Sequence, residues 1–227
     1  MNEDEALHVV LESRAYSYLF FQNLFSGEPT HQSLEIVSSK ESQSALGVYD
    51  TKENASYASS LNAAFEALNS FKENPNETVE VARDEYTRLF YGPGELCAPP
   101  WESIYVSNTE ILFTEDTLAV RNAYRVQGFL PDEYPTVADD HIAYECAFMT
   151  QLANRMEKAC SANDFEAFST ALDASLQFLN EHLLVWIPDY LKKMNGIENA
   201  RLYPKIADLF LEFLHIDAKV LVEIQKE

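Results

Sequence analysis

The first group of residues that could bind a ligand lies in a stretch rich in proline and aromatic side chains. Its members are Tyr86, Leu89, Phe90, Tyr91, Pro99, Pro100, Trp101, Ser103 and Tyr105. Tyrosine and tryptophan offer a large rigid surface with a polar tip, and prolines fix the shape of a loop before a ligand arrives. This composition is typical of a cleft that binds a peptide. The alternative is that the rings fill the core where helices cross, which helical spacing favours for Leu89 and Phe90.

A second group of polar residues is Asp139-Asp140-His141, at the expected start of a helix. Carboxylates there stabilise the positive end of the helix dipole, so either aspartate could simply cap the helix. A neighbouring carboxylate also favours the charged form of His141. A carboxylate beside an imidazole is suited to binding a cationic group. Glu145 lies one turn further along the same face as His141, which leaves a metal site as an alternative.

Signatures of the common enzyme classes are missing from the chain. It contains no G-x-x-x-x-G-K-[ST], no H-E-x-x-H, no G-x-S-x-G and no G-x-G-x-x-G. A third block, residues 178–188, holds His182 and Trp186 within an amphipathic stretch, where a role in the core is the favoured interpretation. We therefore expect no catalytic residue, no metal and no cofactor.

The elements that position these groups are predicted to be helices, because apolar residues recur at helical spacing through nearly the whole chain. Residues 30–50 are more polar and are expected to hold a short helix or two. The stripes predict longer helices over residues 7–25, 57–71, 78–91, 115–127, 182–194 and 201–224, and two more that begin near Asp139 and Asn163.

Prolines and turn residues mark two segments, 92–113 and 128–138, as loops between helices. No segment alternates as a strand does, so the predicted fold class is all-α. We expect a single-domain helical bundle over residues 1–227, with a long ordered loop rich in proline and aromatic residues. A hinge is expected near this loop.

Charge is the unusual feature of the composition. The chain has 16 Lys and Arg against 37 Asp and Glu, a formal net charge of −21. A protein this acidic repels phosphate backbones and anionic lipid, so nucleic acid and membrane surfaces are not expected partners. Cationic partners, basic peptides among them, would be attracted, although net acidity can also serve solubility alone.

The expected compartment is the cytoplasm. The first five residues are acidic where a signal peptide needs positive charge, and no apolar run approaches the length that spans a bilayer. The chain has three cysteines and no C-x-x-C, which suits a reducing compartment.

Four motifs follow one another between residues 86 and 190. They are Leu89-Phe90-x-Gly92-Pro93, Pro99-Pro100-Trp101-x-Ser103-x-Tyr105, Asp140-His141 and Glu181-His182-Leu183-x-x-Trp186-x-Pro188. In this order and spacing they resemble the TorD/DmsD family. The resemblance implies an all-helical cytoplasmic chaperone for redox-enzyme maturation. Such a protein binds the twin-arginine leader of a molybdopterin-containing oxidoreductase and holds the apoenzyme until its cofactor is inserted, before export.

The resemblance also implies which residues bind the leader, by their positions in the matching motifs. These are Tyr86, Leu89, Phe90, Pro100, Trp101, Ser103, Asp140 and His141. The implied partners are the leader and the apo form of the catalytic subunit, with a homodimer as an open alternative. Two other functions remain open: a metal-dependent hydrolase using Asp140, His141 and Glu145, and an adaptor that needs no leader.

Overall fold

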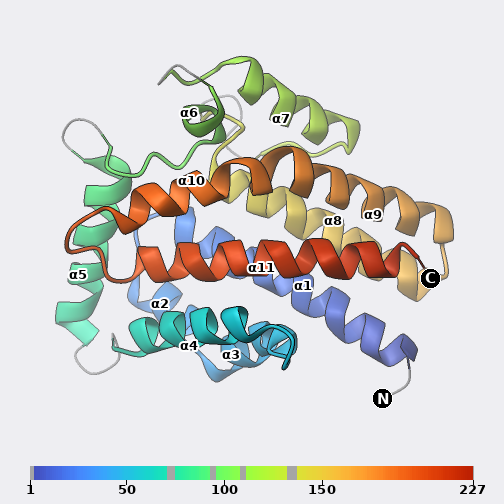
Figure 1. Cartoon of the computed structure of the whole chain (residues 1–227), viewed down its shortest axis with the longest axis horizontal. Helices are drawn as coiled ribbons and strands as arrows, with labels where there is room; N and C mark the ends of the chain where they lie inside the picture. The colour runs from blue at the N-terminus through green and yellow to red at the C-terminus, as the bar shows by residue number, and fades with distance from the viewer. Residues whose placement is uncertain (1–2, 71–74, 93–95, 108–110, 132–136, 227) are drawn as a thin grey trace.

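Apolar side chains spaced three to four residues apart give each long segment one face to bury, and these faces meet as packed helices. The computed structural model describes residues 3–70, 75–92, 96–107, 111–131 and 137–226 (Figure 1). Within these ranges the regular elements are all helical, and the one extended pair is an isolated bridge between Trp101 and His141. The predicted all-α fold class is confirmed.

The order of the helices follows the predicted stripes closely. The elements are α1 (Glu3–Phe25), α2 (His31–Val37), α3 (Lys40–Leu46), η1 (Gly47–Tyr49), α4 (Ala55–Ser70), α5 (Pro75–Tyr86), η2 (Thr87–Tyr91), α6 (Glu102–Val106), α7 (Glu115–Val126), α8 (Ile142–Ala162), α9 (Phe165–Phe178), η3 (Leu179–Leu183), α10 (Leu184–Asn195) and α11 (Tyr203–Ile224). The short helices expected within residues 30–50 are α2 and α3.

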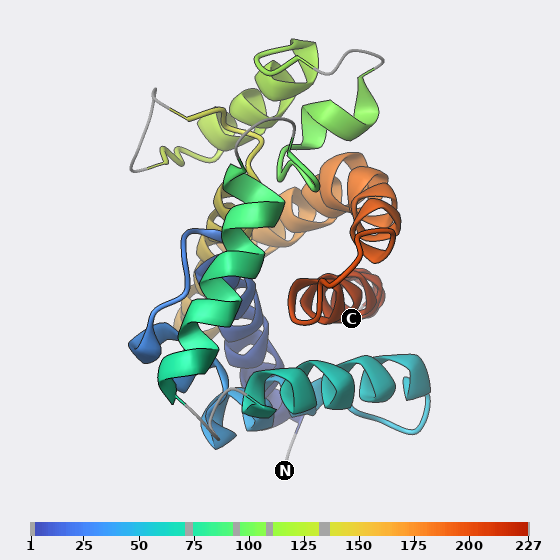
Figure 2. The ribbon, with the colours of Figure 1, turned by 90° about the vertical axis from the view of Figure 1, so that its left-hand side faces the viewer.

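The core lies between the long helices α1, α8 and α11. Helix α1 packs along α8, α8 packs against α9, and α11 packs against both α10 and α4. Figure 2 shows α11 nearly end-on, with α10 above it and α4 below it. Aromatic rings join α1 to α11: Phe21 lies 4.6 Å from Phe210 and Tyr18 lies 5.0 Å from Phe213, measured between ring centroids.

An ion pair is enclosed in this apolar core. Arg14 of α1 donates from Nε to Asp217 of α11 at 2.7 Å, and the Tyr18 hydroxyl donates to the other carboxylate oxygen at 2.6 Å. The side chains of Arg14 and Asp217 are both fully buried. Removing one partner of such a pair leaves an uncompensated charge away from water, so each holds the other in place.

The segment 92–113, predicted as a loop, contains a short helix. Residues Glu102–Val106 form α6, which the sequence analysis missed. Positions 93–95 and 108–110 of this segment lie outside the described residues, and the hinge expected here stays a prediction.

Two of the predicted helix boundaries can be checked by their caps. Helix α9, predicted to begin near Asn163, is capped by Asp164, whose side chain accepts the Ala167 N–H at 3.0 Å. Asn163 instead ends α8 in the left-handed conformation, with φ of 53°. Gly128 follows α7 at φ of 62°, where a residue without Cβ is favoured, so the predicted stop there is confirmed.

Two π-turns interrupt the helices at the motifs that the sequence singles out. In η2 the Gly92 N–H reaches back five residues to the Thr87 carbonyl at 2.6 Å. The second π-turn, η3, covers Leu179–Leu183 and runs directly into α10, which contains Pro188. Single π-turns inside α-helices often mark functional sites.

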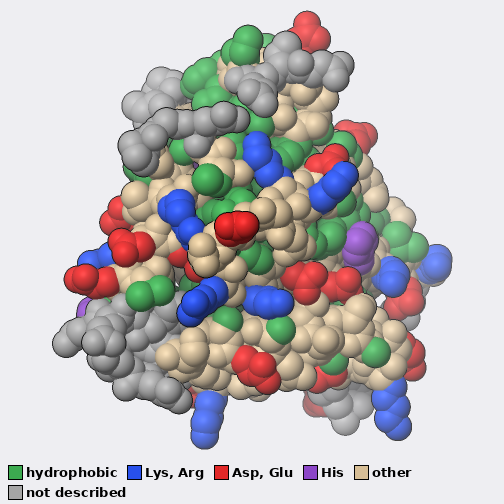
Figure 3. Space-filling view, turned by 60° about the vertical axis from the view of Figure 1, so that its left-hand side comes forward, with side chains coloured by type: hydrophobic (Ala, Val, Ile, Leu, Met, Phe, Trp, Pro, Cys, Tyr) green, Lys and Arg blue, Asp and Glu red, His purple; other side chains and the backbone are tan. Residues whose placement is uncertain are grey.

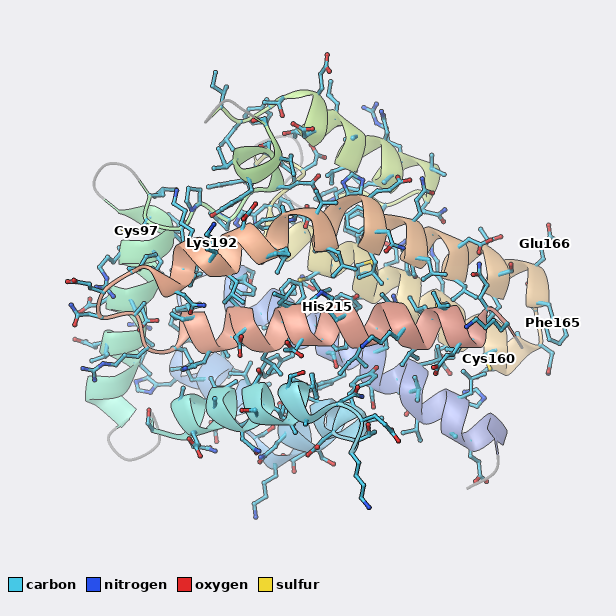
Figure 4. All side chains as sticks on the ribbon, viewed as in Figure 1. Cys97, Cys160, Phe165, Glu166, Lys192 and His215 are labelled. Carbon is cyan, nitrogen blue, oxygen red and sulfur yellow. The ribbon has the colours of Figure 1, made fainter. Side chains whose placement is uncertain are left out.

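Cys97, Cys146 and Cys160 are free thiols. Cys97 and Cys160 lie at opposite ends of the long axis in Figure 4, and Cys146 is buried in α8. Across the described ranges we find no helix that combines the length and the apolar character needed to cross a membrane.

Candidate functional site

A cavity of about 450 Å³ opens where η2, the segment before α6 and the start of α8 meet. We call it the aromatic cavity. It is lined by Ser26, Tyr86, Phe90, Tyr91, Leu96, Pro100, Trp101, Val137, His141, Ala143 and Tyr144. Five of the eight predicted site residues are among them, drawn from segments more than 50 positions apart in the chain.

The π-turn η2 provides one wall of the aromatic cavity. Phe90 packs edge-on against Tyr86 at 4.8 Å and against Tyr203 of α11 at 5.1 Å between ring centroids. The Tyr86 hydroxyl donates to the Phe25 carbonyl at 3.3 Å. These contacts fix both rings on rigid helices, while Tyr91 at the end of the turn is 67% exposed. The wall is therefore preformed, and one aromatic side chain at its edge, Tyr91, faces solvent.

The opposite wall is held by the bridge between Trp101 and His141. The Glu102 N–H donates to the Asp140 carbonyl at 3.0 Å, and the Ile142 N–H donates to the Pro100 carbonyl at 2.9 Å. The two rings meet edge to face at 5.3 Å between centroids. The backbone thus ties the two predicted motifs together, which places Trp101 and His141 side by side.

His141 differs from the sequence-based prediction in two ways. It is itself the N-cap of α8, because its Nδ1 accepts the Ala143 N–H at 3.2 Å, so neither Asp139 nor Asp140 caps that helix. Burial lowers its pKa to about 4, so the expectation that a neighbouring aspartate would favour the charged form is wrong. The ring is neutral at pH 7, with its proton on Nε2.

The two aspartates point away from His141 and serve other elements. Asp140 is fully buried, and its Oδ2 accepts the Ser103 N–H at 2.8 Å, which caps α6 from across the chain. Its Oδ1 has no hydrogen-bond partner among the described residues. Asp139 accepts two hydrogen bonds from Arg121 of α7, at 2.8 Å from Nε and 2.5 Å from Nη2.

Three predicted site residues do not line the aromatic cavity. Leu89, Ser103 and Asp140 are each fully buried behind its walls. Leu89 lies in the core, as the packing alternative suggested. Ser103 and Asp140 form the hydrogen bond that holds the Trp101 turn, so they position the wall.

Four buried polar side chains lie close to one another behind Trp101: Glu102, Glu145, His182 and Trp186, of which the sequence analysis had not singled out Glu102. Both oxygens of Glu102 lie within 3.1 Å of His182 Nδ1. Trp186 donates from its indole to Glu145 at 3.0 Å. Burial, together with the charges of Glu102 and Asp140, raises the pKa of Glu145 well above its usual range. The structural interpretation of His182 and Trp186 holds: each is the partner of a buried acid.

A metal site at Asp140, His141 and Glu145 finds no support in this geometry. The three side chains make separate contacts, to α6, to the backbone of α8 and to Trp186. Within the described ranges no group of three or more His, Cys, Asp or Glu side chains is arranged to hold a metal ion.

The face of the molecule drawn in Figure 3 is of mixed charge. Figure 3 shows lysine and arginine side chains interspersed with acidic ones on the face turned toward the viewer, with apolar side chains visible between them. The charge of −21 is therefore not a uniform negative shell over this face.

Comparison with known proteins defines the class to which this fold and cavity belong. Residues 54–192 match the family model described as nitrate reductase delta subunit. Because the match covers more than half of the chain, the protein belongs to this family, which is the TorD/DmsD family that its motifs resemble.

Individual relatives extend the similarity over nearly the whole chain. The chaperone protein TorD of Aliivibrio fischeri is 28% identical, over 97% of this chain and 99% of its own length. That of Aliivibrio salmonicida is 26% identical over the same shares. Chaperone protein TorD of Vibrio cholerae serotype O1 is 27% identical over 98% of both chains.

Proposed function

We propose that this protein is a cytoplasmic chaperone for the maturation of a redox enzyme, and that it binds the twin-arginine leader of a molybdopterin-containing oxidoreductase in the aromatic cavity. It holds the apoenzyme until the cofactor is inserted, so that export follows assembly. The observation that carries the proposal is the meeting of Tyr86, Phe90, Pro100, Trp101 and His141 around one cavity. The names of the TorD relatives support the role of chaperone.

The apolar part of a leader would pack on the preformed aromatic wall. Tyr86 and Phe90 are held by contacts to α1 and α11, so a ligand loses little free energy in ordering them. A volume of about 450 Å³ accommodates a few side chains of a leader and not its whole length. The cavity therefore acts as an anchor for a short segment.

His141 would bind the backbone of the leader. Because its Nδ1 already accepts the Ala143 N–H, the neutral ring presents Nε2–H as a donor. A donor of this kind suits a peptide carbonyl and does not bind a guanidinium. The sequence-based idea that the imidazole helps to hold a cation is replaced by this role.

The guanidinium groups need carboxylates, and two are near the cavity. Glu28 is exposed, and its Oε1 accepts the hydroxyl of Thr87 in η2 at 3.2 Å, so its charge lies near the cavity wall. The Oδ1 of Asp140 has no hydrogen-bond partner among the described residues, but the residue is enclosed, so a leader guanidinium would reach it only if the Trp101–His141 bridge opened. Bidentate arginine–carboxylate pairs would then supply specificity for the two arginines.

The test is calorimetric titration of a synthetic twin-arginine leader peptide into the purified protein. Trp101→Ala should weaken binding roughly 30-fold, since truncation of a central tryptophan typically costs about 2 kcal/mol or more. Phe165→Ala is the matched control, because Phe165 is 82% exposed at the far end of the molecule in Figure 4. Its affinity should equal that of the parent.

Two outcomes would overturn the proposal. Equal affinity for a twin-lysine peptide would show attraction by charge without recognition of guanidinium groups. Unchanged binding of an oxidoreductase subunit that lacks its leader would favour an adaptor that does not read the leader.

A further inference from the structure

The fourth sequence motif, Glu181-His182-Leu183-x-x-Trp186-x-Pro188, has no place in the aromatic cavity, which none of its residues lines. The motif spans the π-turn η3 and the start of α10. Helix α10 packs against α6, the short helix that begins directly after Trp101, and Figure 1 shows α6 above α10. The motif therefore lies behind the wall of the proposed leader site.

His182 contacts the residue that follows Trp101. Its Nδ1 lies 3.0 Å from Oε1 and 3.1 Å from Oε2 of Glu102, and both side chains are buried. A proton is present on Nδ1 in the imidazolium and in one neutral tautomer, so this hydrogen bond does not depend on the charge of the ring. A buried acid that loses its donor has no water to replace it, so the contact holds Glu102 in place.

Trp186 contacts the other side of the same turn through Tyr105. The two rings stack at 5.4 Å between centroids, with an angle of 29° between their planes. The Tyr105 hydroxyl donates to the Pro99 carbonyl at 2.9 Å, two residues before Trp101. The indole of Trp186 also donates to Glu145 of α8 at 3.0 Å, which fixes its own orientation. The motif thus holds the chain on both sides of Trp101.

The Trp101 ring depends on these supports. Its indole N–H is buried and donates to no described residue. The ring is placed by the backbone on either side and by the edge-to-face contact with His141 at 5.3 Å. Since the ring has no polar contact of its own, a shift of the turn moves the ring and changes the shape of the aromatic cavity.

The burial pattern of η3 fits a supporting role. Leu179, His182 and Leu183 point into the protein, whereas Asn180 and Glu181 are exposed. The His182 ring also packs on Phe178, at 4.6 Å between centroids, so it is fixed from two sides. Single π-turns occur often at functional sites, which favours a role for η3 that goes beyond filling the core.

We propose that this motif positions the wall of the aromatic cavity and holds the Trp101 turn in the conformation that binds the leader. His182 acts through Glu102, on the C-terminal side of Trp101. Trp186 acts through Tyr105, on the N-terminal side. Both are positioning residues, because neither lines the cavity. The link to leader affinity rests on the proposed function, whereas the support of the turn does not.

The first test compares His182→Gln with His182→Asn. Asparagine places an amide N–H where the ring has Nδ1, whereas glutamine places its amide where the ring has Nε2. Hydrogen exchange measured by NMR reports on the turn without a ligand, at the Glu102 and Ile142 N–H groups that form the bridge. Both should exchange roughly 10-fold faster in His182→Gln than in the parent, and within about threefold of the parent in His182→Asn. Equal rates in the two variants would refute the positioning role.

The second support is tested by Tyr105→Phe, which keeps the stack on Trp186 and removes the hydrogen bond to Pro99. The same two bridge amides should exchange about threefold faster or more. Tyr16→Phe is the matched control, because it removes a partly buried hydroxyl that is bonded to Ser42 at 2.6 Å elsewhere in the fold. Parent-like rates in Tyr105→Phe would refute the part assigned to Trp186.

Leader affinity is then measured by calorimetry on the same variants. It should fall roughly 10-fold in His182→Gln and stay within about twofold of the parent in His182→Asn. Asp164→Ala is the control for lost stability, because it removes the N-cap of α9 at the end of the molecule where Figure 4 labels Phe165. Exchange at the bridge and leader affinity should both stay as in the parent.

The outcomes separate this inference from the proposed function. Parent-like leader affinity in His182→Gln, beside the loss expected for Trp101→Ala, would overturn this inference and leave leader binding in place. A parent protein that binds no leader, together with fast exchange in His182→Gln, would overturn the proposed function and support the positioning of the turn.

Discussion

Asp140 offers the sharpest test of which buried groups hold the site and which act in it. Its Oδ2 caps α6 through the Ser103 N–H at 2.8 Å, and its Oδ1 has no partner in the described structure. Asp140→Ala removes the acceptor and leaves a buried N–H, which costs about 1–3 kcal/mol. For a domain of this size that lowers the melting temperature by roughly 2–12 °C. Asp140→Asn keeps an acceptor oxygen, so its melting temperature should barely change.

Binding separates the two roles of the same carboxylate. If the free Oδ1 receives a leader guanidinium, Asp140→Asn removes a charge-assisted hydrogen bond worth about 1.5–3 kcal/mol. Affinity for the leader should then fall roughly 10- to 150-fold while the fold is unchanged. The closest control is Asp139→Asn, which removes a neighbouring charge that is engaged by Arg121 of α7.

The assay is leader titration calorimetry beside thermal unfolding, on all three variants and the parent. Parent-like affinity in Asp140→Asn, together with a destabilised Asp140→Ala, would refute a role in binding and leave Asp140 as the cap of α6. Equal weakening by Asp139→Asn and Asp140→Asn would show that the loss reflects net charge at the turn.

Three other groups, Asp217, Glu85 and His141, give further expected outcomes. Asp217→Asn leaves the fully buried Arg14 without its counter-charge and should lower the free energy of unfolding, measured in urea, by about 3–5 kcal/mol. The double variant R14M/D217L should recover most of this loss. A single variant as stable as the parent would contradict the argument. Glu85 accepts three backbone N–H groups at the start of α11, so Glu85→Gln should lower the free energy of unfolding by about 1–3 kcal/mol, measured by thermal unfolding. A similar loss in Asp84→Asn, at an exposed neighbouring position, would count against the capping role. Burial lowers the pKa of His141 from 6.5 to about 4, so between these pH values the unfolded chain binds more protons than the folded protein does. The free energy of unfolding should therefore fall as the pH drops from 6.5 to about 4. His141→Gln should flatten this part of a plot of urea midpoint against pH, and identical plots for variant and parent would contradict the reasoning.

Helical periodicity was enough to predict the fold class and the order of the long helices, because each long helix buries one continuous stripe. It failed for α6, which has five residues and no stripe of its own. The cap of that helix comes from Asp140, 37 positions beyond Ser103, whose N–H it accepts. A cap supplied from so far away leaves no local signal in the sequence.

The site was predictable where side chain type alone decides, and not where orientation decides. The resemblance implied one site for Trp101 and His141, and the structure brings the two residues side by side, but the sequence could not show that the Asp140 side chain is buried against α6. Glu102 was missed because an isolated acidic residue in a sequence is normally interpreted as exposed to solvent. Its signal was its position, between a tryptophan and a serine in a block otherwise apolar, where a buried partner such as His182 is needed.

The two π-turns make the register of this chain depend on single residues. A π-turn holds one residue more than a regular helical turn does, so deletion of one residue within 87–91 or 179–183 would restore ordinary α-helix locally. The side chains on one flank would then rotate by about 100° relative to those on the other. Point substitution can therefore vary what the aromatic cavity holds, whereas a one-residue change in length at either turn would dismantle its wall. A change in what this protein binds is thus expected to arise by substitution of side chains, and not by insertion or deletion at these two π-turns.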